Sequence, residues 1–150
     1  MPFRIFNSTG RLAGFASLWT SACVTAPVYS TASAGTVLTI VDNASAQEFE
    51  LSVKNRGSRS VCIPEDYWPN ARGQVVVGHN AVLSFVGGSL FAPSADFGFI
   101  VCPHRQCSEI HVPPGGEVTA KIGYSVFGEA SSIASLRERR LTFTLPKRMC

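Results

Sequence analysis

The segment between Cys102 and His111 holds two cysteines and two histidines. Thiolate sulfur and imidazole nitrogen are ligands that suit zinc and copper. A metal-binding protein is therefore one hypothesis for this chain, with Cys102, His104, Cys107 and His111 as the ligand set. Their spacing matches neither the paired ligands of a zinc finger nor the Cys, His and Met order of a blue-copper loop. We favour a disulfide-closed hairpin that carries an incidental histidine.

Four cysteines follow residue 34: Cys62, Cys102, Cys107 and Cys150. In an oxidising compartment they predict two disulfides, although spacing alone leaves the connectivity open. We predict a Cys102–Cys107 bond, because these residues bracket a hairpin. We predict a Cys62–Cys150 bond, because it fastens the last residue to a central hairpin.

Catalytic chemistry has less support. A hydrolase triad needs a nucleophile, a base and an orienting acid, and the histidines are His79, His104 and His111. None stands beside a nucleophile motif, since Gly88-Ser89-Leu90 lacks the flanking pattern of a hydrolase elbow. The adjacent acids Glu65 and Asp66 lie in a loop and are expected to be solvated. A hydrolase is thus the third hypothesis, and we predict a non-enzyme without a cofactor.

The N-terminus predicts export. Residues 1–11 carry two arginines and no acid, residues 12–24 are apolar and small, and Ala32-Ser33-Ala34 has the form that signal peptidase accepts. We predict a signal peptide over residues 1–34, cleavage before Gly35, and a periplasmic or secreted protein. Two alternatives for this segment are a first strand and a membrane anchor, but the apolar run is too short to span a membrane. A third alternative is lipid attachment at Cys23, with residues 24–34 as a tether.

The charge argues against nucleic acid as a partner. The formal net charge is +3, and no acid precedes Asp42. Without Arg4 and Arg11, the remaining 11 basic residues against 10 acidic residues leave +1. A nearly neutral domain lacks the basic surface that binds phosphates.

Short strands separated by turns fill residues 35–150. Phe49, Leu51 and Val53 alternate with polar residues, which is typical of a strand with one buried face. Runs of β-branched residues between turn residues indicate further strands. The strand candidates are 36–41, 47–54, 61–64, 74–77, 81–86, 97–102, 108–112, 118–126 and 141–145, with a hairpin turn at 78–80, an irregular segment at 89–95 and a helix at 130–140.

This pattern predicts one all-β domain, an antiparallel, disulfide-linked β-sandwich of about seven or eight strands. A hairpin turned by asparagine, followed later by Pro-Pro-Gly-Gly-Glu at 113–117 and a long strand, resembles immunoglobulin-like bacterial extracytoplasmic domains. The resemblance implies an immunoglobulin-like arrangement. The Cys-Trp-Cys order of antibody domains does not fit, because Trp68 lies in a loop. A small β-barrel stays open as an alternative.

The favoured function is binding of a protein partner, as an inhibitor, an immunity protein or an envelope assembly module. Recognition is expected in loops, because strands bury their apolar alternation. Aromatic and arginine side chains dominate binding hot spots. For Trp68 a core position is an equally good interpretation. The predicted contact residues are Tyr67, Trp68 and Arg72 in one loop, and His104 and Arg105 in the Cys102–Cys107 hairpin.

Overall fold

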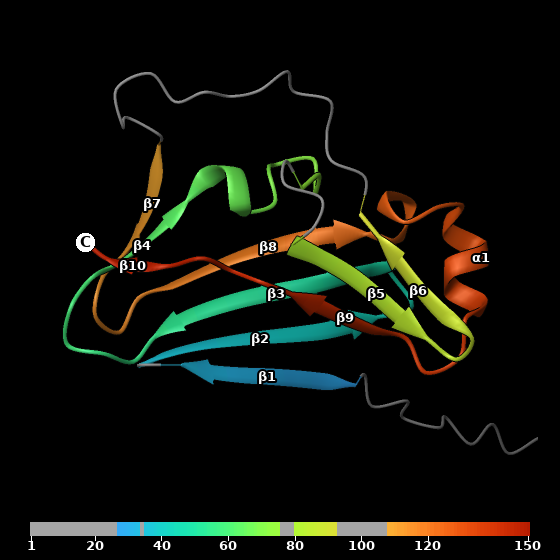
Figure 1. Ribbon diagram of the computed structural model, residues 1–150, viewed down its shortest axis with the longest axis horizontal. Helices are drawn as coiled ribbons and strands as arrows, with labels where there is room; N and C mark the ends of the chain where they lie inside the picture. Colours follow the sequence, from blue (N-terminus) through green and yellow to red (C-terminus); the bar gives the residue numbers. More distant parts are fainter. Residues whose placement is uncertain (1–26, 34, 76–79, 93–107) are drawn as a thin grey trace, which may run out of the picture.

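The computed structural model describes residues 27–33, 35–75, 80–92 and 108–150. In this part of the chain, regular structure is mostly β-strand, and every strand pairing is antiparallel. The prediction of a mostly β, antiparallel protein is therefore confirmed (Figure 1).

The largest described sheet has four strands in the order β1-β2-β3-β8. Its central strand β3 pairs with β2 on one side and with β8 on the other. The predicted alternation holds, since Phe49, Leu51 and Val53 are at most 1% exposed. The strands are β1 (Val28–Ser33), β2 (Thr36–Asn43), β3 (Glu48–Asn55) and β8 (Glu117–Gly123).

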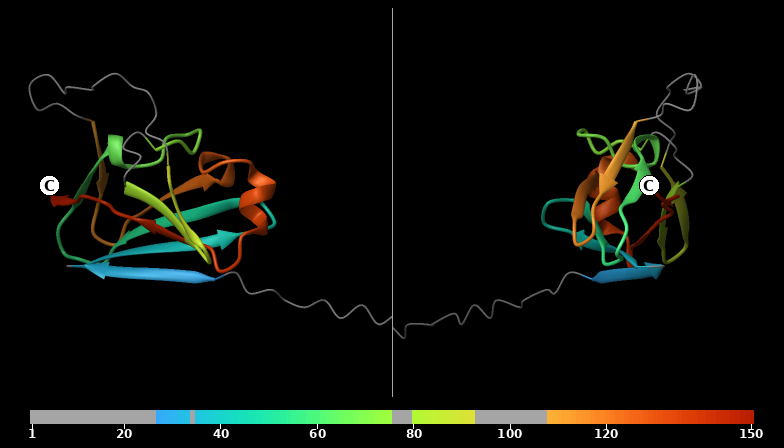
Figure 2. Two further views of the ribbon diagram at one scale, coloured as in Figure 1. Left: turned by 45° about the vertical axis from the view of Figure 1, so that its right-hand side comes forward. Right: turned by 90° about the vertical axis from the view of Figure 1, so that its left-hand side faces the viewer.

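Two three-stranded sheets complete the described part of the fold. In one, β5 lies between β6 and β9, and these strands cross one face of the four-stranded sheet (Figures 1 and 2). In the other, β4 lies between β10 and β7, at one end of the molecule. Their bounds are β4 (Val61–Pro64), β5 (Ala81–Phe85), β6 (Gly88–Phe91), β7 (Glu109–Val112), β9 (Arg140–Phe143) and β10 (Arg148–Met149).

The buried apolar residues form one core cluster, to which the sheets and the connecting segments contribute. Phe49 packs against Tyr124, with ring centroids 5.1 Å apart, and edge-on against Phe127 at 6.3 Å. Trp68 meets Phe143 edge-on at 6.1 Å. Such aromatic pairs add directional contacts to the burial of apolar area. The core therefore extends from the central strand β3 to Trp68.

A buried polar network joins β2 to the C-terminal part of the chain. The Tyr124 hydroxyl donates a hydrogen bond to the Asp42 carboxylate, and Arg139 Nε lies 3.2 Å from the other carboxylate oxygen. The Arg139 guanidinium also lies 5.1 Å from the Tyr124 ring centroid. Burial, together with the bond to Asp42, raises the pKa of Tyr124 to about 12. The phenol therefore keeps its proton, and its donated hydrogen bond, at neutral pH.

Arg139 explains why the helix is shorter than predicted. The helix α1 spans Ala130–Ser135, whereas the sequence predicts 130–140. Arg139 donates to the Ala134 and Leu136 carbonyl oxygens at 2.6 and 2.9 Å. These carbonyls would otherwise accept from later residues of a continuing helix. A side chain that is also paired with Asp42 thus ends the helix.

Two further sequence predictions are wrong in detail. Residues 89–95 were expected to be irregular, but Gly88–Phe91 forms β6, which pairs with β5 after a turn at Gly87, where φ is +109°. The strand expected over 118–126 ends at Gly123, and Tyr124–Val126 forms a 3₁₀ turn. The candidate at 97–102 and most of the predicted 78–80 turn lie outside the described residues.

The N-terminal strand falls within the segment predicted to be a leader. All six residues of β1, Val28–Ser33, pair with β2. The Tyr29 hydroxyl donates to the Arg139 carbonyl oxygen at 3.4 Å, and its ring lies 5.0 Å from the Arg140 guanidinium carbon.

Among the described residues, none of the helices has the length and apolar character needed to cross a bilayer.

The network at Asp42 gives a test of the fold. We expect Asp42→Asn to lower the free energy of unfolding by about 3 kcal/mol, because Arg139, only 12% exposed, loses its charged partner. Glu48→Gln is the control, because it breaks an ion pair whose lysine, Lys121, is 63% exposed, and its effect should be much smaller. Urea denaturation measures both. A loss for Asp42→Asn as small as that expected for Glu48→Gln would show that the buried network contributes little to stability.

Candidate functional site

The first candidate site is a loop over residues 65–75, called here the Trp68 loop. Its base is held by the core, because Trp68 is 5% exposed and Pro69 is buried. Trp68 N donates to the Glu65 carbonyl oxygen at 3.0 Å, and Asn80 Nδ2 donates to the Tyr67 carbonyl oxygen at 2.9 Å. The base of the loop is therefore anchored from two sides.

The tip of the Trp68 loop is fixed by Asn70. Its Oδ1 accepts from the backbone N–H groups of Arg72 and Gln74, at 2.9 and 3.1 Å, and its own N–H donates to the Gln74 carbonyl at 3.0 Å. Gly73 has φ +71°, and a Cβ there would lie 2.9 Å from the Lys121 carbonyl oxygen. Glycine thus allows the tip to rest against β8.

A groove runs between the tip and the outer face of the four-stranded sheet, with Pro69, Asn70 and Ala71 on the loop side. Its floor includes three hydroxyl side chains in one row across β2, β3 and β8, because Thr39 pairs with Ser52 and Ser52 with Thr119. Lys121 stands beside this row and forms an ion pair with Glu48 at 2.5 Å. The groove therefore presents hydrogen-bonding groups and charge beside apolar residues such as Val41 and Ala120.

The predicted contact residues do not all lie on this surface. Arg72 is exposed and Tyr67 is half-buried, so both can contribute contacts. Trp68 is a core residue packed on Phe143, which removes it from the predicted partner-binding set. His104 and Arg105 lie outside the described residues.

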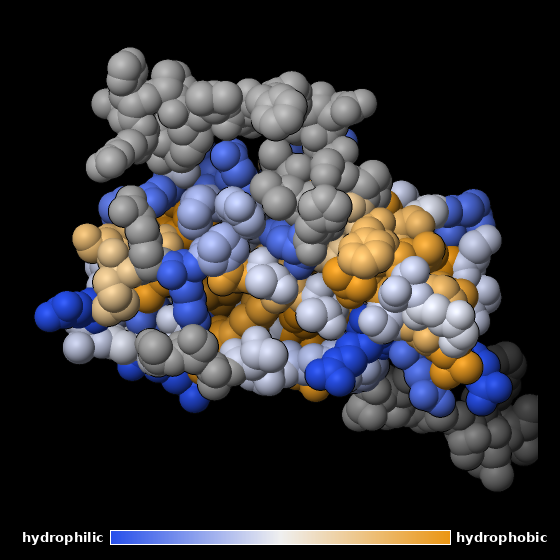
Figure 3. Space-filling view, in the orientation of Figure 1, coloured by the Kyte–Doolittle hydropathy of each residue, from blue (hydrophilic) through white to orange (hydrophobic). Residues whose placement is uncertain are grey.

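Exposed apolar side chains occur elsewhere, on and beside the β5–β6 hairpin. Val86 and Phe91 are 59% and 61% exposed. Figure 3 shows hydrophobic surface over this part of the molecule. Isolated exposed apolar residues are common on soluble proteins. We therefore assign no role to them.

The second candidate site surrounds the disulfide between Cys62 and Cys150. The two residues are separated by 88 positions in the sequence, and their Cα atoms lie 5.2 Å apart. β10 pairs with β4, and Cys150 N donates to the Ser60 carbonyl oxygen at 3.1 Å, which brings the last residue to Cys62. The predicted Cys62–Cys150 pair is therefore confirmed. Cys102 and Cys107 lie outside the described residues.

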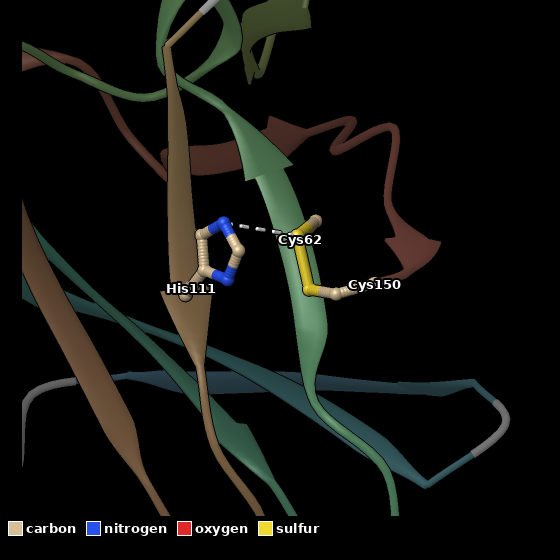
Figure 4. A group of neighbouring side chains, drawn as sticks. All are labelled: Cys62, His111 and Cys150. Atoms are coloured by element: carbon tan, nitrogen blue, oxygen red, sulfur yellow. Dashed lines mark hydrogen bonds between the residues drawn. A yellow bond between two sulfur atoms is a disulfide. The ribbon is translucent and has the colours of Figure 1, made fainter.

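A histidine joins this disulfide. His111 on β7 is directly opposite Cys62 on β4, and its Nε2 lies 3.6 Å from the Cys62 sulfur (Figure 4). Cys62 is buried, whereas His111 and Cys150 are exposed. The ligand atoms of all three residues lie within 4.8 Å of one another. The alternative metal-binding hypothesis grouped His111 with Cys102, His104 and Cys107, which lie outside the described residues, and the described neighbour of His111 is Cys62.

The sequence contained no signal for this cluster beyond the residue types. Cys62 and His111 are 49 positions apart, and they meet because β4 and β7 pair in one register. No family model, curated protein or solved structure matches this chain. Function therefore has to be argued from these two sites.

The two predicted disulfides should differ in their contribution to stability. In the chain-entropy model, closing a loop on the order of 90 residues stabilises by roughly 4 to 5 kcal/mol, and closing about six residues by roughly 2 kcal/mol. We therefore expect Cys150→Ser to lower the free energy of unfolding more than Cys107→Ser does. Urea denaturation without reductant measures this difference. The reverse order would contradict the pairing or its energetic basis.

Proposed function

We propose that this chain is an exported, disulfide-bonded β-domain that binds a protein partner. The observation that carries the proposal is the Trp68 loop, whose backbone is fixed at base and tip while Asn70, Ala71 and Arg72 stay exposed. A loop that is already ordered loses little conformational entropy on binding. Its surface is thus suited to recognition.

The chemistry of the loop indicates what kind of partner surface fits. Arginine and tyrosine are the residue types enriched in binding hot spots, and Arg72 and Tyr67 occupy this loop. The adjoining groove offers the hydroxyls of Thr39, Ser52 and Thr119. We infer that the partner presents a polar or acidic segment, with carboxylates opposite Arg72 and hydrogen-bonding groups above the hydroxyl row.

The disulfide supports the proposed compartment. Cys62–Cys150 is a bond that persists in oxidising environments and is rare in the cytosol. We propose that residues 1–34 act as the export signal, that the protein is periplasmic or secreted, and that the fold is an immunoglobulin-like sandwich. The arrangement of β5, β6 and β9 across the four-stranded sheet favours two facing layers.

Processing affects the binding surface. Cleavage before Gly35 removes β1 and leaves the paired edge of β2 open along six residues. An open strand edge can accept an added strand from a partner. Lipid attachment at Cys23 would instead retain β1. The two processing routes therefore predict different edges for the same sheet.

The alternative functions have less support from the geometry. The metal-binding hypothesis took Cys102, His104, Cys107 and His111 as ligands. The structure describes His111 of this set, and His111 lies beside Cys62. The hydrolase hypothesis needs a histidine between a nucleophile and an acid. His111, the one histidine in the described ranges, lies beside a disulfide sulfur.

Substitutions in the Trp68 loop test the proposal. We expect Arg72→Ala and Tyr67→Ala each to weaken partner binding by roughly 30-fold, about 2 kcal/mol, and to leave the melting temperature nearly unchanged. The partner is first recovered with the exported domain from an envelope or secreted extract, identified by mass spectrometry, purified, and titrated by calorimetry.

Two controls separate binding from stability. Arg137→Ala removes another exposed arginine and should leave binding unchanged. Trp68→Ala should lower stability by about 3 kcal/mol, because it empties part of the core. Full binding by both loop variants, or a loss of binding that only tracks a loss of stability, would remove the Trp68 loop as the recognition site.

A further inference from the structure

The cluster of Cys62, Cys150 and His111 has a second chemical state. With the sulfurs bonded to each other, the cluster cannot take a metal through both of them. When the disulfide is reduced, the same three side chains supply two sulfurs and one imidazole nitrogen (Figure 4). We propose that the reduced protein binds one zinc ion at Cys62, Cys150 and His111, and that oxidation to the disulfide closes this site.

The distances fit zinc. Around a tetrahedral ion with Zn–S of about 2.3 Å and Zn–N of about 2.0 Å, neighbouring sulfur and nitrogen ligands lie about 3.5 Å apart. Cys62 Sγ and His111 Nε2 are 3.6 Å apart. These two ligands are held by the pairing of β4 with β7, so they need little rearrangement.

The third ligand has to move, and its position permits this. On reduction, the two sulfurs must separate to about 3.8 Å, the spacing of two thiolates on tetrahedral zinc. Cys62 is 1% exposed and fixed within β4, whereas Cys150 is exposed and follows the two-residue strand β10. Cys150 is therefore the sulfur that swings outward. Its exposure, and that of His111, leaves an entry path and room for water as a fourth ligand.

The chemistry balances with a dithiol as the reductant. The dithiol gives two electrons and two protons to the Cys62–Cys150 bond and becomes a disulfide, while the protein gains two thiols. Zinc then replaces the two thiol protons, which are released to solvent. The bound ion is neutralised by two thiolates, and the imidazole completes the protein ligands. Zinc and the disulfide are thus mutually exclusive occupants of one site.

This inference does not depend on the proposed partner. It adds a role for His111 before the chain is oxidised, or after it is reduced. Reduction removes a covalent link between β4 and the C-terminal residue, and zinc would restore that link through its ligands. Because the ion binds the folded state, its binding free energy contributes to folding.

The test uses the full chain with Cys23→Ser, Cys102→Ser and Cys107→Ser, so that Cys62 and Cys150 are the remaining thiols. The protein is reduced with a dithiol, which is removed under nitrogen, and is titrated with zinc against a chromophoric chelator. We expect one zinc per reduced chain and none per oxidised chain. His111→Ala should weaken binding at least tenfold.

A folding readout covers the case in which reduction unfolds the chain. Zinc should then restore the β-sheet circular dichroism signal, and otherwise it should raise the melting temperature of the reduced protein. The proposal is overturned if the reduced chain neither binds zinc nor responds in stability. It is also overturned if His111→Ala binds zinc as tightly as the parent, because the thiols alone would then account for binding.

Discussion

The fold depends on the hydrogen bonds of one buried side chain, Asn55, at the end of the central strand β3. Its Nδ2 donates to the carbonyl oxygens of Arg59 and Val112, at 2.8 and 2.9 Å, and its Oδ1 accepts from Gly57 N at 2.9 Å. Asn55 is only 1% exposed. Because an unpaired buried amide is costly, separating these segments would be strongly unfavourable. Asn55 therefore ties the four-stranded sheet to β7 and to the turn that leads into β4. This arrangement positions the disulfide site, since His111 precedes Val112 and Cys62 follows the turn.

Local patterns were enough to predict the parts of the fold that depend on neighbouring residues. The period of two in β3 was visible because Phe49, Leu51 and Val53 all face the core. The Cys62–Cys150 pair was also predicted, since the expectation of export favoured disulfides and this bond fastens residue 150 to the central hairpin. The end of α1 was not visible, because it depends on Arg139, whose other partner Asp42 lies 97 positions away. β6 was missed because Gly88 at its start has low strand propensity and the segment gains regular structure by pairing with β5.

The two candidate sites also differ in how far local sequence could predict them. The Trp68 loop was predicted from its residue types, and Arg72 is exposed as a contact residue must be. Trp68 itself could not be placed from sequence, because an aromatic side chain in a loop suits a core as well as a binding surface. The Cys62, His111 and Cys150 cluster depends on strand register between β4, β7 and β10. Register between distant strands is a tertiary property, so the sequence supplied the ligands without their arrangement.

Export of the chain and its closure by the Cys62–Cys150 bond underlie the proposed function. Non-reducing tryptic peptide mapping of the chain recovered from an exported fraction tests it most directly. We expect an N-terminal peptide that begins at Gly35, and peptide 60–72 linked through Cys62 to peptide 149–150 through Cys150. A chain that retains Met1 and carries Cys62 and Cys150 as free thiols would contradict it.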